Sequence, residues 1–477
     1  MPDLDPEEFR RLGHALVDWV AAHRAGLAEL PVRPAVRPGE IRAALPADLP
    51  DEPADDLGAA LTGLLDAVVV PGSLHWQHPG FYGYFPAQAS LLSLLGDLAS
   101  GGLGAQGMLW STSPAGTEVE QVLVDGFARA LGLGEAFTFA GGGGGSLQDS
   151  ASSAALVALL AALHRASLDW RETGVDGTER VYVTAETHSS LAKAVRVAGL
   201  GARALRTVPF SPGTRAMSAD ALAVMLAEDR AAGLRPVLVC PTVGTTGTGA
   251  IDPVRKVCEV AGGAWVHVDA AWAGVAALCP EFRHVLDGAE LADSVCTDAH
   301  KWLATAFDAS FLWVRDGTAL PAALSITPEY LRNAASESGQ VVDYRDWQVP
   351  LGRRFRALKL WSVVNGAGLE GLRDAIRGHV ALARDLAAWV EADPRFALAA
   401  PPSLALVCLH VLGPDDEPDD AAGRALLERV NAGGRAFLTH TTVDGRYAIR
   451  VAIGALGTGP EHLETLWKEL TASSSGI

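Results

Sequence analysis

The segment Ala264-Trp-Val-His-Val-Asp-Ala-Ala-Trp-Ala-Gly274 contains a short apolar run that is typical of a buried strand and that ends in the carboxylate of Asp269. Similar runs, Val181-Tyr-Val and Phe311-Leu-Trp-Val, alternate with Ala- and Leu-rich helical stretches over about residues 86–370. This alternation predicts an α/β domain with a mainly parallel sheet that is covered by helices. A carboxylate at the carboxyl end of a strand lies where such sheets place ligands, although it could equally cap the next helix.

Residues 1–85, before this domain, are predicted to form a helical arm. Asp5-Pro-Glu-Glu8 supplies an N-cap residue, a first-turn proline and acidic residues at the start of a helix, and Phe9 and Leu16 belong to the apolar face that follows. Residues 31–56 are rich in proline and interrupt the helical pattern. Because the apolar face needs burial, we expect the arm to pack on another surface.

Residues 371–477, after the α/β domain, are predicted to form a small α+β domain. They contain two strand-like apolar runs, at residues 404–411 and 447–453, together with amphipathic helical stretches. A chain of 477 residues is too long for one ordinary core, which agrees with a large domain and smaller flanking pieces.

The composition argues against several classes of function. Acidic residues outnumber basic ones by 56 to 38, the formal charge is -18, and there is no basic stripe for a nucleic acid backbone. The five cysteines lie far apart, without the spacing of a metal site or the density of a secreted scaffold. The N-terminus lacks the pattern of an export signal, and the longest apolar stretch, residues 154–163, is shorter than the ~20 residues of a membrane span. We expect a cytoplasmic protein without a metal, nucleic acid or membrane partner.

A glycine-rich segment indicates an anion site. In Ala140-Gly-Gly-Gly-Gly-Gly-Ser-Leu-Gln-Asp-Ser-Ala-Ser152 the glycines lead through Ser150 and Ser152 into an apolar helix. Backbone N–H groups at a helix N-terminus, with hydroxyl groups nearby, suit a phosphate. The segment is not a P-loop, because no Gly-Lys-Ser/Thr follows. Taken alone, a flexible loop capped by serine explains it equally well.

The candidate nucleophile is Lys301. It stands in the apolar, tryptophan-flanked segment Cys296-Thr-Asp-Ala-His-Lys-Trp-Leu303. A lysine in such surroundings is expected to lose its charge and to attack a carbonyl group, as Schiff-base chemistry requires, whereas a surface lysine would serve no chemistry. Lysine is rare in this chain, and the full set is Lys193, Lys256, Lys301, Lys359 and Lys468.

A fourth signal is the histidine in Val183-Thr-Ala-Glu-Thr-His-Ser-Ser190, just past another predicted strand. A lone histidine is more often a structural residue, so His188 carries little weight in isolation. The glycine-rich segment, His188, Asp269 and Lys301 nevertheless follow one another at the sheet edge of a single α/β domain. Together they predict one active site.

With these motifs, the chain resembles the group II pyridoxal-phosphate decarboxylases, in particular the aromatic-L-amino-acid decarboxylases. The resemblance covers nearly the whole length and implies the fold of fold-type-I pyridoxal-phosphate-dependent transferases, with a seven-stranded, mainly parallel sheet and pyridoxal 5'-phosphate as cofactor. Further segments that carry it are Trp76-Gln-His-Pro-Gly-Phe-Tyr-Gly-Tyr-Phe-Pro86, Ser113-Pro-Ala-Gly-Thr-Glu118, Cys279-Pro-Glu-Phe-Arg283 and Asp343-Tyr-Arg-Asp-Trp-Gln-Val-Pro-Leu-Gly-Arg-Arg-Phe-Arg356.

The resemblance implies a role for each matching residue. Lys301 would form the Schiff base with the cofactor, and Asp269 would keep the pyridine nitrogen protonated. His188 would lie flat against the ring, with Ala271 on the opposite face. A loop over residues 325–345 would close on the substrate, and its Tyr330 would donate a proton to Cα. The residues implied around the phosphate are Ser150, Ala151, Ser152 and His300, with Thr246 near the ring substituents.

The resemblance also implies a homodimer that shares its active sites, with the arm packed on the partner. Leu109 from the neighbouring subunit would complete the substrate pocket. Gly352 would leave room for a wide ring, which favours tryptophan-sized substrates and leaves phenylalanine, tyrosine, dopa and 5-hydroxytryptophan open. The pocket residues implied within the chain are Trp76, Tyr84, Phe85, Pro86 and His188.

Two positions depart from the family pattern. Asp298 replaces an asparagine that is common near the phosphate, and a carboxylate there should repel the phosphate unless it is protonated or turned away. Ala87 replaces a hydroxyl residue, so one hydrogen bond to the substrate or cofactor would be missing.

Three other functions remain as alternatives. An aromatic aldehyde synthase would keep the fold and couple decarboxylation to oxidative deamination, but relatives of that kind typically lose the loop tyrosine or the stacking histidine, and Tyr330 and His188 are both present. An aminotransferase or lyase on this fold would lack the His-Lys pair and the Tyr-Arg-Asp-Trp-Gln segment. A cofactor-free interaction protein would not need the complete set of catalytic residues.

Overall fold

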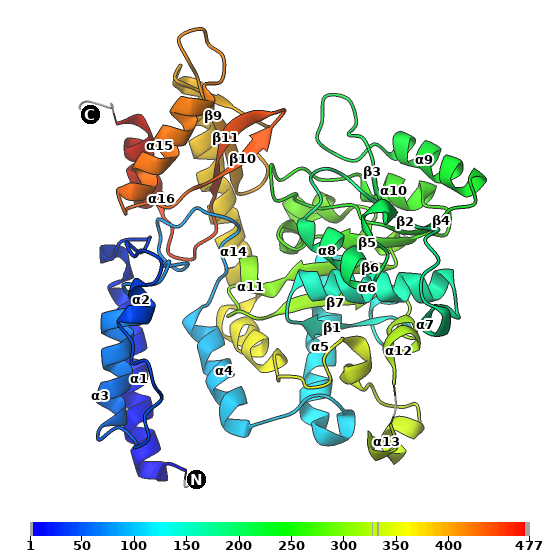
Figure 1. The fold of residues 1–477 in the computed structure, drawn as a ribbon, viewed down its shortest axis with the longest axis horizontal. Coiled ribbons are helices and arrows are strands. Elements are labelled where there is room, and N and C mark those ends of the chain that lie inside the picture. The colour runs from blue at the N-terminus through cyan, green and yellow to red at the C-terminus, as the bar shows by residue number, and fades with distance from the viewer. Residues whose placement is uncertain (1–2, 327, 332, 473–477) are drawn as a thin grey trace.

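The computed structural model describes residues 3–326, 328–331 and 333–472, and within them the large domain is built on a seven-stranded sheet (Figure 1). Strand β7 is antiparallel to β1 and to β6, and the other neighbours are parallel, so the predicted mainly parallel sheet of seven strands is confirmed. In spatial order the strands are β1 Gly144–Gln148, β7 Ser310–Val314, β6 Ser294–Asp298, β5 Trp265–Asp269, β4 Arg235–Val239, β2 Glu179–Val183 and β3 Leu205–Thr207.

Alternate residues of the central strands face two separate apolar cores, because successive side chains of a strand point to opposite faces. Val266 and Val268 of β5 belong to the core that includes residues of α5, α9 and α10, whereas Trp265 belongs to the core that includes α6, α8 and α12. In β7, Trp313 and Leu312 divide in the same way. Burial on both faces explains why these strands are apolar throughout.

Helices cover both faces of this sheet. The α-helices of this part are α4 Leu91–Leu103, α5 Pro114–Leu131, α6 Ala151–Ala166, α7 Trp170–Thr173, α8 Ser189–Val197, α9 Ala219–Ala231, α10 Val254–Val260, α11 Ala299–Trp302, α12 Ala319–Leu324 and α13 Ala334–Glu337. Shorter turns of 3-10 helix are η3 Trp110–Thr112, η4 Glu135–Phe137, η5 Ala202–Ala204, η6 Ala273–Leu278, η7 Pro280–Leu286, η8 Ala289–Leu291, η9 Glu329–Leu331 and η10 Tyr344–Trp347.

The long helix α14, Ala357–Ala392, leads from the large domain into the C-terminal part (Figure 1). Its backbone leaves the helical conformation at Gly368, where φ is 66° and ψ is 168°. This break lies close to residue 370, where the sequence predicts the boundary of the large domain, and we propose the break as the physical boundary. The C-terminal part contains a four-stranded antiparallel sheet in the order β10 Thr439–Val443, β11 Arg446–Ala452, β9 Leu406–Val411 and β8 Phe396–Leu398, with helices α15 Asp420–Ala432 and α16 Pro460–Thr471.

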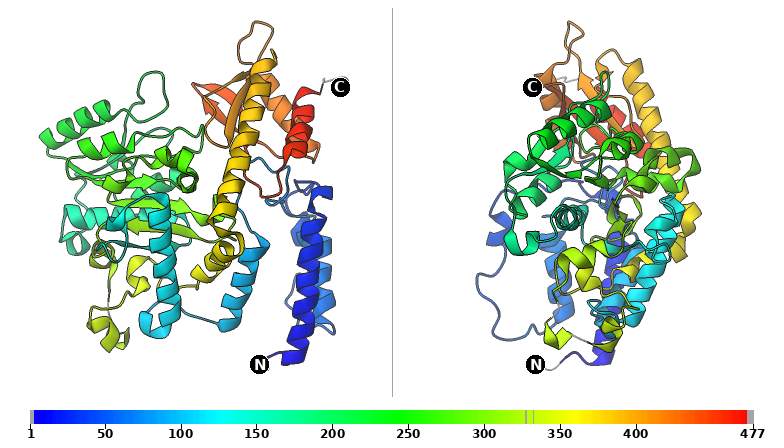
Figure 2. Two further views of the ribbon diagram at one scale, coloured as in Figure 1. Left: turned by 180° about the vertical axis from the view of Figure 1, so that it is seen from behind. Right: turned by 90° about the vertical axis from the view of Figure 1, so that its right-hand side faces the viewer.

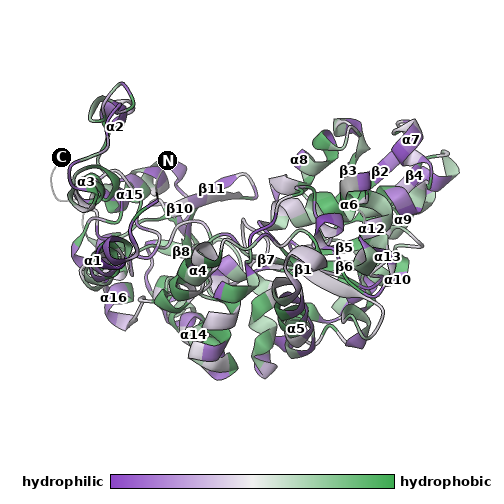
Figure 3. Ribbon diagram, turned by 90° about the horizontal axis from the view of Figure 1, so that it is seen from below, coloured by the Kyte–Doolittle hydropathy of each residue, from purple (hydrophilic) through white to green (hydrophobic). Residues whose placement is uncertain are grey.

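The N-terminal arm stands apart from the large domain (Figure 1; Figure 2, left). Asp5 caps α1 as predicted, since its side chain accepts the Glu7 N–H. The arm has no buried residue in its three described α-helices, and Figure 3 shows hydrophobic residues on α3 at the edge of the molecule. Its elements are α1 Pro6–Ala25, η1 Leu27–Glu29, α2 Glu40–Ala43, α3 Leu57–Leu64 and the π-helical turn η2 Leu65–Val69.

Among the described helices, none is long and apolar enough to cross a membrane. All five cysteines are free thiols, and four of them are buried.

Candidate active site

The carboxyl ends of β4, β5 and β6 and the start of α6 and α8 surround one cavity of about 300 Å³. This is the sheet edge at which α/β folds bind ligands. All the cofactor residues that the family resemblance implies line it, together with two of the four aromatic-pocket residues. The lining residues are Tyr84, Phe85, Ser150, Ala151, Ser152, His188, Thr242, Gly244, Thr246, Asp269, Ala271, Trp272, Asp298, His300 and Lys301.

Lys301 lies in the short helix α11, directly after β6, and its ammonium group pairs with a carboxylate. Its Nζ is 2.7 Å from Oδ2 of Asp298, whose Oδ1 accepts the Ala151 N–H at 3.1 Å. Burial disfavours the charged lysine, but the Asp298 carboxylate outweighs this effect and raises the pKa of Lys301. The expectation that the apolar surroundings discharge Lys301 is therefore wrong. A carboxylate three residues earlier in the chain supplies the compensating charge.

Asp269 is the last residue of β5, and the residue is 9% exposed. Its Oδ1 accepts the Ala271 N–H at 3.1 Å and lies 3.8 Å from the Cys296 thiol. The following 3-10 helix η6 begins at Ala273 without a side-chain cap, so helix capping does not account for this carboxylate. A buried carboxylate in this position can hold a protonated ring nitrogen.

His188 is the N-cap residue of α8, and the helix fixes its ring. Its Nδ1 accepts the Ser190 N–H at 3.2 Å and lies 2.9 Å from the Ser190 hydroxyl oxygen. A ring nitrogen that accepts a backbone N–H carries no proton, so these contacts leave Nε2 as the ring nitrogen that can donate. His188 therefore both caps α8 and lines the cavity.

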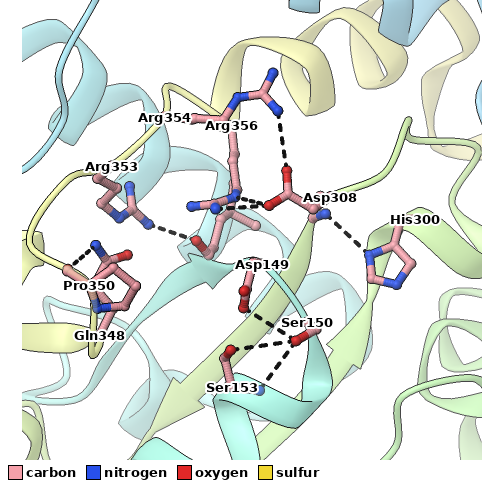
Figure 4. A network of polar contacts seen from close by, with 12 residues as sticks. Asp149, Ser150, Ser153, His300, Asp308, Gln348, Pro350, Arg353, Arg354 and Arg356 are labelled. Carbon is pink, nitrogen blue, oxygen red and sulfur yellow. Dashed lines mark hydrogen bonds and ion pairs between the residues drawn. The ribbon is translucent and has the colours of Figure 1, made fainter. Parts of the chain in front are cut away.

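The anion end of the cavity is the N-terminus of α6. Ser150 caps this helix, its hydroxyl oxygen accepts the Ser153 N–H at 3.3 Å, and the hydroxyl lies 3.2 Å from an Asp149 carboxylate oxygen (Figure 4). His300 accepts the Ala309 N–H through Nδ1 at 3.2 Å, and burial lowers its pKa. Backbone N–H groups at a helix start, with hydroxyl groups beside them, suit a phosphate.

The five glycines that precede this helix have a structural role. None of the described lining residues is one of them, and Gly144 and Gly145 are the first two residues of β1. A Cβ atom at Gly141 would lie 1.9 Å from the Glu135 carbonyl oxygen, and one at Gly143 would lie 2.1 Å from that of Ala136. The predicted anion site is therefore confined to the serine segment, and the glycines allow close backbone packing ahead of it.

One part of the cavity wall is aromatic and includes Tyr84, Phe85 and Trp272. Phe85 stacks on Trp272 with ring centroids 4.1 Å apart, and Tyr84 stacks on Trp76 at 5.5 Å. Trp76 thus supports the wall from behind, while Pro86 lies farther back beside Gly454. Sequence reasoning missed Trp272, although it follows Asp269 by only three residues and could have been found from that spacing.

Arg450 on β11 was also missed, because nothing in its surrounding sequence marks it. It is 3% exposed, its Nε donates to the Thr246 carbonyl oxygen at 2.7 Å, and its Nη1 donates to that of Tyr84. Its guanidinium carbon lies 4.3 Å from the centre of the Phe85 ring. Burial lowers the pKa of Arg450 to about 10. The residue therefore joins the C-terminal sheet to three residues of the cavity wall.

Two further predicted site residues lie away from the cavity lining, and the side chain of a third is not described. Leu109 is buried and Gly352 is exposed, and neither belongs to the cavity lining. The two lie near each other, because the Arg353 N–H donates to Gln106 at 2.7 Å and the Gly107 N–H to the Arg353 carbonyl at 2.9 Å. The backbone of Tyr330 belongs to η9, and its side chain lies outside the described part of the structure.

The residues present fit pyridoxal 5'-phosphate. The cavity offers a lysine amine for the aldehyde, a carboxylate for the ring nitrogen and a helix N-terminus with serine hydroxyls for the phosphate. These three groups are the ones that the cofactor's three functional parts require. The carboxylate of Asp298 at the phosphate end is the one feature that opposes the fit.

Comparison with known proteins agrees with this reading. The model of the pyridoxal-dependent decarboxylase conserved domain matches residues 38–412. Tyrosine/DOPA decarboxylase 2 of Papaver somniferum is 42% identical over 98% of this chain and 93% of its own length, and phenylacetaldehyde synthase of Arabidopsis thaliana is 41% identical over 99% and 97%. The crystal structure of Oryza sativa TDC with PLP and tryptamine superposes with a TM-score of 0.94 at 38% identity, covering 98% of each chain. The chain therefore belongs to the pyridoxal-dependent decarboxylase family and is a carboxy-lyase that uses pyridoxal 5'-phosphate.

Proposed function

We propose that this enzyme decarboxylates an aromatic L-amino acid to the arylalkylamine and carbon dioxide, with tryptophan-sized side chains favoured. The observation that carries the proposal is the convergence of Lys301, Asp269 and His188 on one cavity whose wall contains Tyr84 and Phe85. The relatives support an aromatic substrate, because one is named a tyrosine/DOPA decarboxylase and another was crystallised with tryptamine.

The bound cofactor supplies an electron sink for the pair of electrons that is left when the carboxylate departs. Lys301 holds the cofactor through its amine, and Asp269 accepts a hydrogen bond from the ring nitrogen and keeps a proton there. His188 and Ala271, which line the cavity, would confine the two faces of the bound ring and help to orient the substrate. Tyr330 is proposed to deliver the proton to Cα after carbon dioxide leaves.

The remaining residues position the cofactor and the substrate. Thr246 would contact the ring substituents, and Tyr84 and Phe85, supported by Trp76 and Pro86, would bind the substrate side chain. Leu109 and Gly352 of the partner subunit complete the pocket, which explains why these two residues lie away from the cavity of their own chain. Ser150, Ala151, Ser152 and His300 would hold the phosphate.

A homodimer is proposed because the arm and α4 expose too much apolar surface for a free chain. On α4, Leu95, Leu98 and Leu103 are 62%, 58% and 67% exposed, and on α1 Phe9 is 58% exposed. Apolar residues gathered on neighbouring elements mark an interaction surface. The cytoplasm is proposed as the location, since all five cysteines are free thiols.

An aromatic aldehyde synthase is the second candidate, because relatives named phenylacetaldehyde synthase are 41% and 40% identical to this chain. That reaction consumes oxygen and releases the aldehyde, ammonia and hydrogen peroxide with carbon dioxide. The presence of both Tyr330 and His188 favours the decarboxylase.

The deciding experiment measures amine, aldehyde, carbon dioxide and peroxide from tryptophan, 5-hydroxytryptophan, phenylalanine, tyrosine and dopa. We expect one amine per carbon dioxide without peroxide, and no turnover by Lys301→Ala. Lys193→Ala, at an exposed position of α8, is the matched control and should retain activity. Aldehyde with an equal amount of peroxide would instead establish the aldehyde synthase.

A further inference from the structure

The anion end of the cavity contains a buried carboxylate of its own. Asp298, the last residue of β6, has a side chain that is 3% exposed, and its Oδ1 accepts the N–H of Ala151, the first residue of α6. That N–H is one of the groups that would otherwise be free to bind a phosphate oxygen. Asp298 therefore already uses part of the anion site.

The same carboxylate faces two basic side chains. Its Oδ2 lies 2.7 Å from Nζ of Lys301 and 3.6 Å from Nε2 of His300. The side chains of Asp298 and His300 are 3% and 6% exposed, so solvent and salt screen their charges weakly. The ammonium group of Lys301 is thus neutralised by Asp298 and is unavailable to attract a phosphate.

We infer that Asp298 is a positioning residue that weakens the hold of this site on the cofactor's phosphate and keeps the amine of Lys301 in place. A phosphate dianion at the start of α6 meets the carboxylate as a like charge and competes with it for the Ala151 N–H. An asparagine would fill the same volume and could still accept that N–H, but it would carry no charge. The inference rests on the proposed cofactor site and describes how tightly that site retains its cofactor.

The test compares two ligands that differ only in the phosphate and that lack the aldehyde. Pyridoxamine 5'-phosphate and pyridoxamine are titrated into the cofactor-stripped full-length dimer, and binding is followed calorimetrically at pH 8. The dissociation constant of pyridoxamine divided by that of pyridoxamine 5'-phosphate reports the contribution of the phosphate alone. In Asp298→Asn this ratio should increase about tenfold over the wild-type value, because one like charge is removed.

Asp229→Asn is the matched control, because Asp229 is also 3% exposed but contacts Tyr182 and Arg206, away from the cavity. Its ratio should stay within about twofold of wild type. Asp298→Ser, which removes the charge with a smaller side chain, should reproduce the asparagine result and guards against a folding defect. Thermal unfolding of every variant is measured alongside.

A ratio that is unchanged or decreased in both Asp298 variants would overturn the inference while leaving the cofactor site intact. Failure of the wild-type protein to bind pyridoxamine 5'-phosphate, or to develop a Lys301-dependent visible absorbance with pyridoxal 5'-phosphate, would overturn the cofactor site itself and this inference with it.

Discussion

Arg450 carries a positive charge into the cavity wall without a carboxylate partner in the described contacts. Its guanidinium group donates to the carbonyl oxygens of Thr246 and Tyr84 and lies over Phe85, so backbone dipoles and an aromatic face replace a counter-ion. Such a residue fixes the position of a wall that belongs to a different part of the chain.

We predict that Arg450→Met lowers the free energy of unfolding by about 3 kcal/mol, because two buried hydrogen bonds to a charged group are lost. The KM for the aromatic substrate should also rise, since the Tyr84–Phe85 wall loses its anchor. Arg446→Met is the matched control on the same strand: Arg446 pairs with Asp420 at 3.3 Å in an exposed position and should contribute less than about 1 kcal/mol. Urea denaturation and steady-state kinetics measure both effects, and equal losses in the two variants would contradict the assignment.

Gly352 provides a second prediction at the residue scale. Gly352→Ser should shift the ratio of kcat/KM from tryptophan towards tyrosine and dopa by about tenfold, because the side chain narrows the pocket and adds a hydroxyl group. Gly378→Ser, at an exposed position of α14 with no neighbouring atom within 4 Å of an added Cβ, should leave the ratio unchanged. Competition assays with mixed substrates give the ratio directly, and an unaltered preference in Gly352→Ser would remove this residue from the pocket.

At the scale of elements, the cavity depends on how the segments after each strand are held. Asp252 secures the segment after β4: its carboxylate accepts the Thr242 N–H at 2.7 Å and the Met217 N–H at 2.6 Å. Thr242 in turn lines the cavity. Burial raises the pKa of Asp252 from 3.8 to about 6 despite these two hydrogen bonds.

The raised pKa predicts a specific dependence of stability on pH. The folded protein binds the Asp252 proton more tightly than the unfolded chain, so this stabilisation is complete below about pH 4 and is lost as the pH rises through 6. The loss amounts to about 3 kcal/mol. The asparagine of Asp252→Asn cannot titrate, so the variant does not lose this stabilisation. Its free energy of unfolding minus that of the wild type should therefore increase by about 3 kcal/mol between pH 4 and pH 7. Urea denaturation across this range measures the difference, and a constant difference would refute the assignment.

At the scale of the whole molecule, we propose that each active site takes residues from two copies of the chain. Lys301 lines the cavity, whereas Gly352 is exposed and lies away from it. A partner subunit that packs on the apolar faces of α1 and α4 would bring Gly352 to the neighbouring cavity. If the sites are shared between subunits, two different inactive variants can restore activity in a hybrid dimer. Separate sites could not do so.

We predict that two inactive variants complement each other. Lys301→Ala and Gly352→Trp homodimers should both be inactive, the first without its amine and the second with a blocked pocket. Random reassociation of equal amounts after mild dissociation gives half hybrids, each with one intact site, so about one quarter of the wild-type activity should return. Mixing without dissociation is the control and should return none. If hybrid dimers form but stay inactive, each site takes Lys301 and Gly352 from the same chain.

Much of the large domain follows from local sequence. The strand runs at Val181, Trp265 and Phe311 are apolar on both faces, and the Ala- and Leu-rich stretches between them can only be helices, so the alternation predicts the sheet and its layers. Lys301, Asp269, His188 and the serines at the start of α6 stand at or within a few residues of strand ends, and the carboxyl ends of parallel strands meet at one edge. Their convergence in a single cavity was therefore predictable.

Three features were not predictable in this way: the charge of Lys301, the structural role of the five glycines and the position of Arg450. The sequence by itself determined the layers and the residues at the strand ends, because periodicity and strand-end position are local properties, and the cofactor followed from the family resemblance of its motifs. Only the tertiary structure decided which carboxylate neutralises Lys301 and which arginine of the C-terminal sheet supports the wall. Burial and charge pairing depend on segments that are far apart in the chain, as Arg450 is from Tyr84. A local sequence pattern does not show which distant segments come into contact.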